Sequence, residues 1–436
     1  MEKRDYLDKV AEQIRCKRAV PAVTAELEQH IFDQKEAFMD AGMSESEAEA
    51  RAVEEMGDPI EAGQKLDQIH RPSTPWNAIF LIGMIAVGCQ LLLSRLATQT
   101  GSFSSYRNLF FLVTGYVLMI AICYVDYTWI AKHAAKFMAG IAILIAANFF
   151  FGLSINGQKF WLYLPFLNFT LDIRLLSWLF VPLYCAMLYH IKITRQQKTL
   201  RILFWLCLPV AFTAFGLGIF QGVLLFFLLL LCTGAAIYKD WFPVRQKRLI
   251  LSLCLGTAAS VPALLAGYIL LFGADYQIAR LTAVFSNNPD ANYIPNILRE
   301  LFAASRFCGS NGLESAFTDR LPDSASYLLS FVNCTYGILA GATVCGLLLI
   351  LFIGLLIRSL RQKNQLGMLM SSGCSVVFIL QLILWIGQNL GMQPLFSIYC
   401  PFVTYGGSGT LVTFVLLGII LCVYRNEQVL PSEISL

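Results

Sequence analysis

Charge and histidine are scarce in this sequence. Of its 436 residues, 14% are charged and 4 are histidine, whereas 57% are hydrophobic. A soluble chain of this length would carry more charge, so the composition predicts a protein that crosses a membrane several times. Its 13 cysteines occur singly and lack the paired spacing of a zinc site, which indicates packing residues. Serine-hydrolase motifs are missing. A P-loop is missing as well, which argues against a self-sufficient ATP-driven pump.

The charge that is present is unevenly distributed. Residues 1–72 hold 17 Asp and Glu against 10 Lys and Arg, whereas the rest of the chain is basic. Helical periodicity in this region begins with Tyr6, Val10 and Ile14, and Ser44 with Glu47 forms a capping-box pattern. We therefore predict a small cytoplasmic helical domain over 1–72, which resembles the prefix domain fused to some bacterial permeases. Nothing in it indicates catalysis.

Ten apolar segments follow, each near the ~20 residues that a membrane helix needs. With a cytoplasmic N-terminus, alternation places the most basic connections inside, as the positive-inside rule requires. The predicted fold class is all-α: a polytopic domain over 75–425 with about ten transmembrane helices, the 1–72 domain, and a cytoplasmic tail over 426–436. The eighth segment is longer than one crossing needs, so its start is expected outside the bilayer. The segments are 77–97, 109–125, 137–155, 173–191, 202–220, 222–238, 249–272, 328–357, 366–390 and 402–424.

This topology places a long loop, 273–327, outside the cell. Acid–base chemistry is expected there, because the loop holds most of the acidic residues of the membrane domain. All four histidines fall on the cytoplasmic side, which disfavours a His-dependent ligase of the O-antigen type. Charge is sparse within the spans, which disfavours a proton-coupled transporter. The acidic residues of the loop are Asp275, Asp290, Glu300, Glu314, Asp319 and Asp323.

Four stretches interrupt the apolar pattern in a characteristic order. They are NGQKFWLYL (156–164), YQIARLTAVFSNNPD (276–290), FCGSNGLESAFTDRLPDSASYLLSF (307–331) and QNLGMQPLFSIYCPFVTYGGSG (388–409). In this order they resemble motifs of the SEDS family (shape, elongation, division and sporulation), typified by FtsW and RodA. The last is the most specific, because PFVTYGGSG matches the family pattern PFISYGGSS at most positions. Over about 75–430 the sequence is identified as a divergent member of this FtsW/RodA/SpoVE-like family.

The resemblance implies a peptidoglycan glycosyltransferase of the cell wall that extends glycan strands from lipid II during cell division, elongation (cell shape) or sporulation. Its implied partners are lipid II or another undecaprenyl-linked precursor and a class B penicillin-binding transpeptidase, without nucleic acid. The implied location is the bacterial plasma membrane, with both termini cytoplasmic. The resemblance implies at most a divalent cation, Mg²⁺ or Mn²⁺, as cofactor, and no metal ligands are assigned.

Carried over position by position, the motifs imply a substrate site. Arg280 matches the family's arginine at the loop entrance and is the first candidate for diphosphate contact, with Lys159 second. For Arg280 the alternative is snorkelling at a helix end. The other candidates would line an outward cavity, although Asn389 could equally make a helix–helix hydrogen bond and the glycine stretch a small-residue helix contact. These candidates are Asn389, Thr404, Tyr405, Gly406, Gly407 and Ser408.

The sequence departs from the family where the resemblance would place the catalytic aspartate. That position falls on Tyr327, or on Ser326 if the register is counted from Gly337, and neither side chain can act as a carboxylate base. The QPSE-like motif reads FTLDIRLLS, and Phe160 stands where the family has an arginine. Three hypotheses follow: an active polymerase using Asp323 from one helical turn away, an inactive scaffold or regulator of a class B penicillin-binding protein, or a transporter of lipid-linked precursors.

Overall fold

The computed structural model divides the chain into two compact units. The first comprises Met1–Pro75, Gln362–Gln365 and the end of the chain from Val423, and the second comprises Trp76–Arg361 and Leu366–Cys422. The residues that the structure describes are 1–17, 19–101, 103–155, 158–165, 169–194, 198–242, 247–252, 255–256, 263, 267, 270–271, 278, 292–310, 312–321, 324–392 and 398–429.

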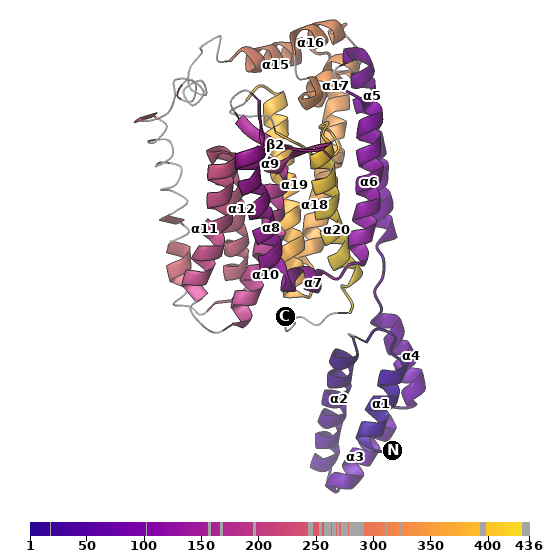
Figure 1. Cartoon of the computed structure of the whole chain (residues 1–436). Coiled ribbons are helices and arrows are strands. Elements are labelled where there is room, and N and C mark those ends of the chain that lie inside the picture. Colours follow the sequence, from indigo (N-terminus) through magenta and orange to yellow (C-terminus); the bar gives the residue numbers. More distant parts are fainter. Residues whose placement is uncertain are drawn as a thin grey trace. The chain divides into compact units, whose positions relative to one another are not determined.

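Four helices build the first unit (Figure 1): α1 (Lys3–Gln13), α2 (Val20–Asp40), α3 (Glu45–Glu55) and α4 (Pro59–Ile69). Asp58 caps α4 by accepting from the backbone N–H groups of Ile60 and Glu61, with proline at the first helical position. The apolar stripe of α1 supplies the centre of the core, because Tyr6 and Val10 are fully buried. Val429, from the tail that follows the last helix, is 4% exposed and belongs to the same core.

Replacement of Val429 by aspartate tests this contribution of the tail. We expect the free energy of local opening of α1–α4 to fall by about 2 kcal/mol, because the new carboxylate would be buried without a partner. Amide hydrogen exchange of the full-length protein measures it, with Met39→Asp as the control, since Met39 lies 42% exposed on α2. Equal protection in the two variants would show that the tail is dispensable to this core.

The second unit is a bundle of long helices (Figure 1). Nine helices among the described residues are long and apolar enough to cross a membrane, which confirms a polytopic helical protein. More than half of the predicted seventh segment, 249–272, lies outside the described residues. The nine are α5 (Trp76–Thr100), α6 (Ser105–Tyr124), α8 (Ala134–Phe151), α9–α10 (Ile173–Ile193), α11 (Lys198–Leu217), α12 (Ile219–Tyr238), α18 (Ile338–Leu360), α19 (Gln365–Asn389) and α20 (Gly407–Arg425).

Three of these spans form the interior of the bundle. The apolar windows of α9–α10, α19 and α20 are 72%, 67% and 78% buried, whereas those of α5, α6, α8, α11, α12 and α18 are between 22% and 44% buried. The outer spans therefore present wide apolar faces, which a bilayer would solvate. The glycine-rich stretch begins α20, so it belongs to the most buried of the nine described spans.

The eighth predicted segment is two helices rather than one. α17 (Leu328–Tyr336) ends at Gly337, where α18 begins. Gly337 has φ +95°, and a Cβ there would lie 2.9 Å from the backbone of Cys308. Glycine is therefore required by both the backbone angle and the close approach. α17 packs with the short helices α15 (Tyr293–Ala304) and α16 (Glu314–Arg320) above the bundle in Figure 1.

A small antiparallel sheet was not predicted. The helix expected to continue to residue 155 ends at Phe151, and β1 (Leu153–Ile155), β2 (Gln158–Leu164) and β3 (Phe169–Asp172) follow in the order β1-β2-β3. Ile155 pairs with Gln158, so the connection has two residues, and its sequence Asn-Gly is the strongest short-range hairpin signal. We refer to the end of the bundle that carries this sheet and α15–α17 as the hairpin end.

Candidate functional site

The end of β3 is bonded to the beginning of α20. The Ser408 hydroxyl accepts a hydrogen bond from the Asp172 backbone N–H at 2.9 Å and donates to the Thr170 carbonyl at 3.4 Å. Ser408 is 5% exposed. These two bonds, which we call the Ser408 latch, join segments 236 residues apart and place the most family-specific stretch of the sequence against the sheet.

Two glycines beside the latch allow close packing. A Cβ at Gly407 would lie 2.6 Å from the ring of Phe111, and a Cβ at Gly409 would lie 2.2 Å from the ring of Tyr399. No side chain fits at such distances, so the stretch needs glycine for its contacts. Gly407 thus allows α20 to approach Phe111 of α6 closely, which is the kind of small-residue contact that the glycine-rich stretch suggested.

Substitution of Ser408 by alanine removes the latch. One neutral hydrogen bond contributes about 1 kcal/mol, so exchange of the Asp172 amide proton should accelerate roughly fivefold. Residue-resolved hydrogen exchange measures this directly. Ser371→Ala is the control, because the Ser371 hydroxyl donates to Gly367 within α19. An unchanged rate at Asp172 would mean that the latch does not protect the end of β3.

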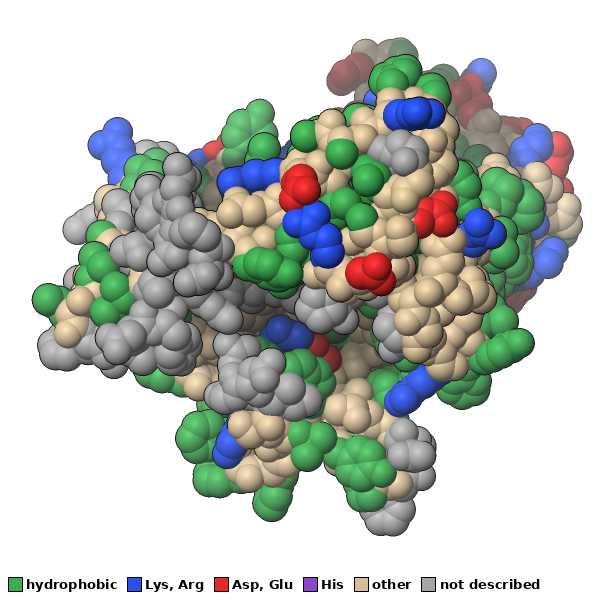
Figure 2. Space-filling model, turned by 90° about the horizontal axis from the view of Figure 1, so that it is seen from above, with side chains coloured by type: hydrophobic (Ala, Val, Ile, Leu, Met, Phe, Trp, Pro, Cys, Tyr) green, Lys and Arg blue, Asp and Glu red, His purple; other side chains and the backbone are tan. Residues whose placement is uncertain are grey.

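An acid–base pair lies directly after the latch. Asp172 caps the one-turn helix α9 (Ile173–Leu176) by accepting from the Arg174 N–H at 3.0 Å. Its carboxylate also accepts from Arg174 Nε at 3.1 Å and from Nη2 at 2.6 Å. The guanidinium lies 4.5 Å from the ring centre of Phe160 and 5.5 Å from that of Trp161. Seen from above, the molecule is hollowed, and a basic and an acidic side chain are visible together inside the hollow (Figure 2).

Asn389 makes the helix–helix hydrogen bond that was one alternative for it. It is 2% exposed, and its Oδ1 accepts from the Ser330 backbone N–H of α17 at 3.2 Å, while its Nδ2 donates to the Trp385 carbonyl within α19 at 3.0 Å. The Trp385 indole donates to the Ser326 carbonyl at 3.1 Å. α19 therefore holds the start of α17, including Tyr327, which is 9% exposed.

The remaining predicted residues lie in different surroundings. Lys159 is exposed on β2, with its Nζ 3.3 Å from the Phe149 carbonyl. The Thr404 hydroxyl accepts from the Cys400 N–H at 3.0 Å, and the tilted rings of Tyr405 and Phe103 have their centres 4.6 Å apart. Gly406 precedes α20 directly. Arg280 and Asp323 lie outside the described residues. The structure thus joins Ser408 to Asp172 and Arg174, two residues that motif matching did not select.

The helices α15 and α16 are joined by an ion pair at the surface. Arg320 Nη2 donates to Glu300 Oε2 at 2.8 Å, and this hydrogen bond, with the guanidinium charge, holds the pKa of Glu300 below its usual range. At the other side, Gln99 of α5 donates to Glu314 of α16 at 2.6 Å. Because Glu300 and Glu314 are already paired at the surface, they do not have the environment of poised acid–base groups.

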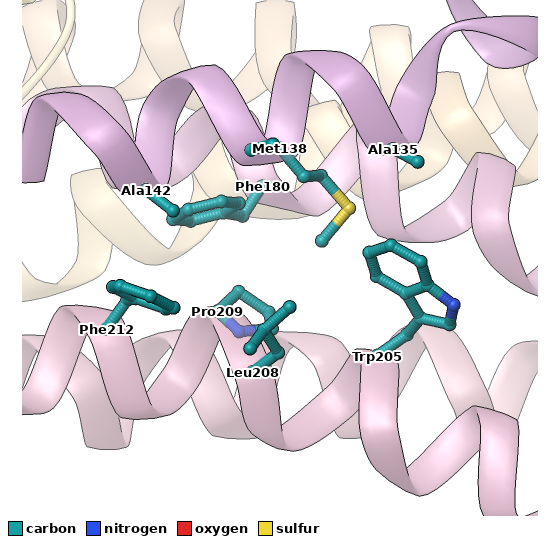
Figure 3. A pocket seen from close by; sticks show the side chains of 9 residues that line it. Ala135, Met138, Ala142, Phe180, Trp205, Leu208, Pro209 and Phe212 are labelled. Atoms are coloured by element: carbon teal, nitrogen blue, oxygen red, sulfur yellow. The ribbon is translucent and has the colours of Figure 1, made fainter.

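A small apolar pocket of about 80 Å³ lies between α8, α10 and α11 (Figure 3). None of the side chains that line it is ionisable, so it offers no group for acid–base chemistry. Its lining residues are Ala135, Met138, Ala139, Ala142, Phe180, Trp205, Leu208, Pro209 and Phe212.

The divalent cation stays a prediction. Among the described residues there is no group of three or more His, Cys, Asp or Glu side chains that could hold a metal ion. Asp172, the acid beside the latch, is engaged by Arg174.

Comparison with known proteins identifies the family. A family model for cell cycle proteins of the FtsW/RodA/SpoVE group matches residues 72–429. A probable peptidoglycan glycosyltransferase FtsW of Enterococcus hirae is 23% identical over 313 residues, covering 67% of this chain and 75% of that protein. The peptidoglycan glycosyltransferase MrdB of Helicobacter pylori is 24% identical over 360 residues, covering 78% and 87%.

Solved structures show the same fold. A chain from a peptidoglycan synthase complex superposes with a TM-score of 0.66 at 18% identity, covering 81% of this chain and 98% of that one. The rod shape determining protein RodA of Thermus thermophilus superposes with a TM-score of 0.57 at 16% identity, with the same coverage. The family match extends over the whole bundle, including the hairpin and the glycine-rich stretch, and the chain therefore belongs to the FtsW/RodA/SpoVE family of cell cycle proteins.

Proposed function

We propose that this protein binds lipid II at its hairpin end, in the plasma membrane of a bacterium, as part of the machinery that synthesises peptidoglycan. The observation that carries the proposal is the Ser408 latch, because it fixes the most family-specific stretch against the sheet, directly before the paired charges of Asp172 and Arg174. The names of the relatives, peptidoglycan glycosyltransferases, support the same role.

The hairpin end is proposed to face the cell exterior. The opposite helix ends carry clusters of basic residues, including Lys192 at the end of α10 and Arg358 and Arg361 at the end of α18. Basic residues concentrate on the cytoplasmic side of membrane proteins. Both termini would then be cytoplasmic, and a lipid-linked sugar would reach the site from the outer leaflet.

Binding without polymerisation is favoured by the residues at the expected catalytic position. Tyr327 and Ser326 are 9% and 6% exposed, and neither carries a carboxylate. A phenol or an alcohol is almost fully protonated near neutral pH unless strongly activated, so neither suits the role of general base. In this proposal the protein presents lipid II to, or regulates, a class B penicillin-binding transpeptidase. The similarity to a chain of a peptidoglycan synthase complex supports such a partner.

Purified protein in nanodiscs with fluorescent lipid II tests the proposal. We expect saturable binding of lipid II, no binding of the same label on phosphatidylglycerol, and no muramidase-sensitive polymer. Asp323→Ala is measured in parallel. Polymer made by the wild type and lost in this variant would instead establish an active glycosyltransferase with a displaced base. Equal retention of both lipids would contradict the proposal.

A further inference from the structure

The guanidinium of Arg174 is held in one orientation by its surroundings. Its side-on edge, formed by Nε and Nη2, meets both oxygens of Asp172, and its face lies near the rings of Phe160 and Trp161. The Ser408 latch fixes the backbone from which Asp172 extends. A cationic group restricted in this way loses less entropy when it binds a ligand.

The same guanidinium keeps donors for a ligand. Arginine has five N–H groups, and within the described part of the chain the side-chain hydrogen bonds of Arg174 are the two to Asp172. The end-on edge, formed by one N–H of Nη1 and the second N–H of Nη2, can therefore still donate, as can the other N–H of Nη1. The Arg174 side chain is 21% exposed, so a ligand can reach it, whereas its partner Asp172 is 15% exposed.

The location of the charge also matters. Phe160 stands where the family resemblance would place an arginine, yet the Arg174 guanidinium lies 4.5 Å from the Phe160 ring centre. β2 and β3 are paired, with Trp161 opposite Asp172, so the cation reaches this position from α9, the helix that directly follows the neighbouring strand. A positive charge is thus present beside residue 160 although the side chain at 160 is neutral.

We propose that Arg174 binds the diphosphate group of a polyprenyl-linked ligand through its end-on edge, while Asp172 holds the guanidinium in place. The inference rests on the proposed function and adds the residue that recognises the headgroup. Phosphate oxygens match the fork of an arginine, and a charge-assisted bond in a half-covered site is stronger than one in water. Asp172 orients the arginine and does not itself contact the ligand, so it is a positioning residue.

Binding of undecaprenyl diphosphate and of inorganic pyrophosphate to the full-length protein in nanodiscs tests this role. Arg174→Gln should weaken binding of both by about tenfold or more, because a charged hydrogen bond is lost. Arg174→Lys should lose less, since the charge stays but the fork does not. Asp172→Asn should weaken binding less than Arg174→Gln does, because asparagine can still cap α9 and accept one bond from the guanidinium through its amide oxygen, but it no longer holds both donors.

The controls separate recognition from a structural ion pair. Arg320→Gln removes a cation from the hairpin end that pairs with Glu300 at the surface, and it should leave both affinities unchanged. Binding of undecaprenyl diphosphate should also weaken with added salt, and less steeply in Arg174→Gln. If Arg174→Gln and Asp172→Asn weakened ligand binding equally, the ion pair would only stabilise the turn between β3 and α9. That result would overturn the proposal.

The two ligands separate the headgroup from the lipid chain. Pyrophosphate should compete with undecaprenyl diphosphate, and undecaprenol without phosphate should not. Competition by undecaprenol alone would overturn the inference, because recognition would then reside in the hydrocarbon. The inference would also be overturned if Arg174→Gln bound lipid II as tightly as the wild type does. The proposed function would remain intact in that case.

Discussion

Valine at position 409 is expected to destabilise the membrane bundle by about 2 kcal/mol or more, as overpacking of a closely packed contact does. Gly409 lies in the first turn of α20, and its missing Cβ is replaced in space by the Tyr399 ring, at 2.2–2.5 Å from three ring atoms. Movement of the ring would also break the contact of the Tyr399 hydroxyl, which lies 3.4 Å from the Thr410 hydroxyl of the same turn. The midpoint of thermal unfolding in detergent measures the effect.

Gly354→Val is the matched control. Gly354 lies in α18, and nothing is within 4 Å of a Cβ built there. This variant carries the same added volume and the same β-branched side chain, so it should unfold close to the wild type. If the two valine variants unfold at the same temperature, the contact between Gly409 and Tyr399 does not limit stability.

The long helices could be predicted from sequence because each depends on a local property. About twenty apolar residues must form a helix in a bilayer, since no water is available for the backbone groups. The short helices of the N-terminal region were equally readable, since Asp58 and Pro59 mark the start of α4 through local capping chemistry. Family membership was predictable because a single stretch, PFVTYGGSG, is specific.

The sheet could have been found and was not. Residues 153–155 continue an apolar run, so hydropathy alone extends the third span through them. The Asn156-Gly157 pair between two β-prone segments was the contrary signal. The hairpin was therefore indicated by its local turn sequence, but the continuous hydropathy of the segment favoured a longer helix.

The residues around the latch could not be predicted in the same way. Ser408 and Asp172 are 236 residues apart, and nothing local indicates that one accepts from the other. Arg174 lies in a motif that departs from the family pattern. Comparison with the family motifs therefore selected Arg280 and Lys159, and not Arg174, as candidates for diphosphate contact. Its place beside Phe160 follows from strand pairing, which only the fold reveals.

Leucine at position 389 is expected to release the start of α17. The first backbone N–H groups of a helix lack partners within it, and the residue before α17 offers no side-chain cap. Asn389 of α19 supplies that partner from another helix, by accepting from the Ser330 N–H at 3.2 Å. A buried N–H left without an acceptor costs about 1–3 kcal/mol, so Asn389→Leu should lower thermal stability and accelerate exchange at the Ser330 amide.

Gln381→Leu distinguishes this role from general polarity in α19. Gln381 is 4% exposed, and its Oε1 has no hydrogen-bond partner among the described residues. Its replacement by leucine should therefore cost less than that of Asn389, and should leave exchange at Ser330 unchanged. Because Tyr327 and Ser326 precede the same helix start, a released α17 would also loosen the segment that occupies the family's catalytic position. Slow exchange at Ser330 in Asn389→Leu would mean that this segment is held by its own packing, and not by α19.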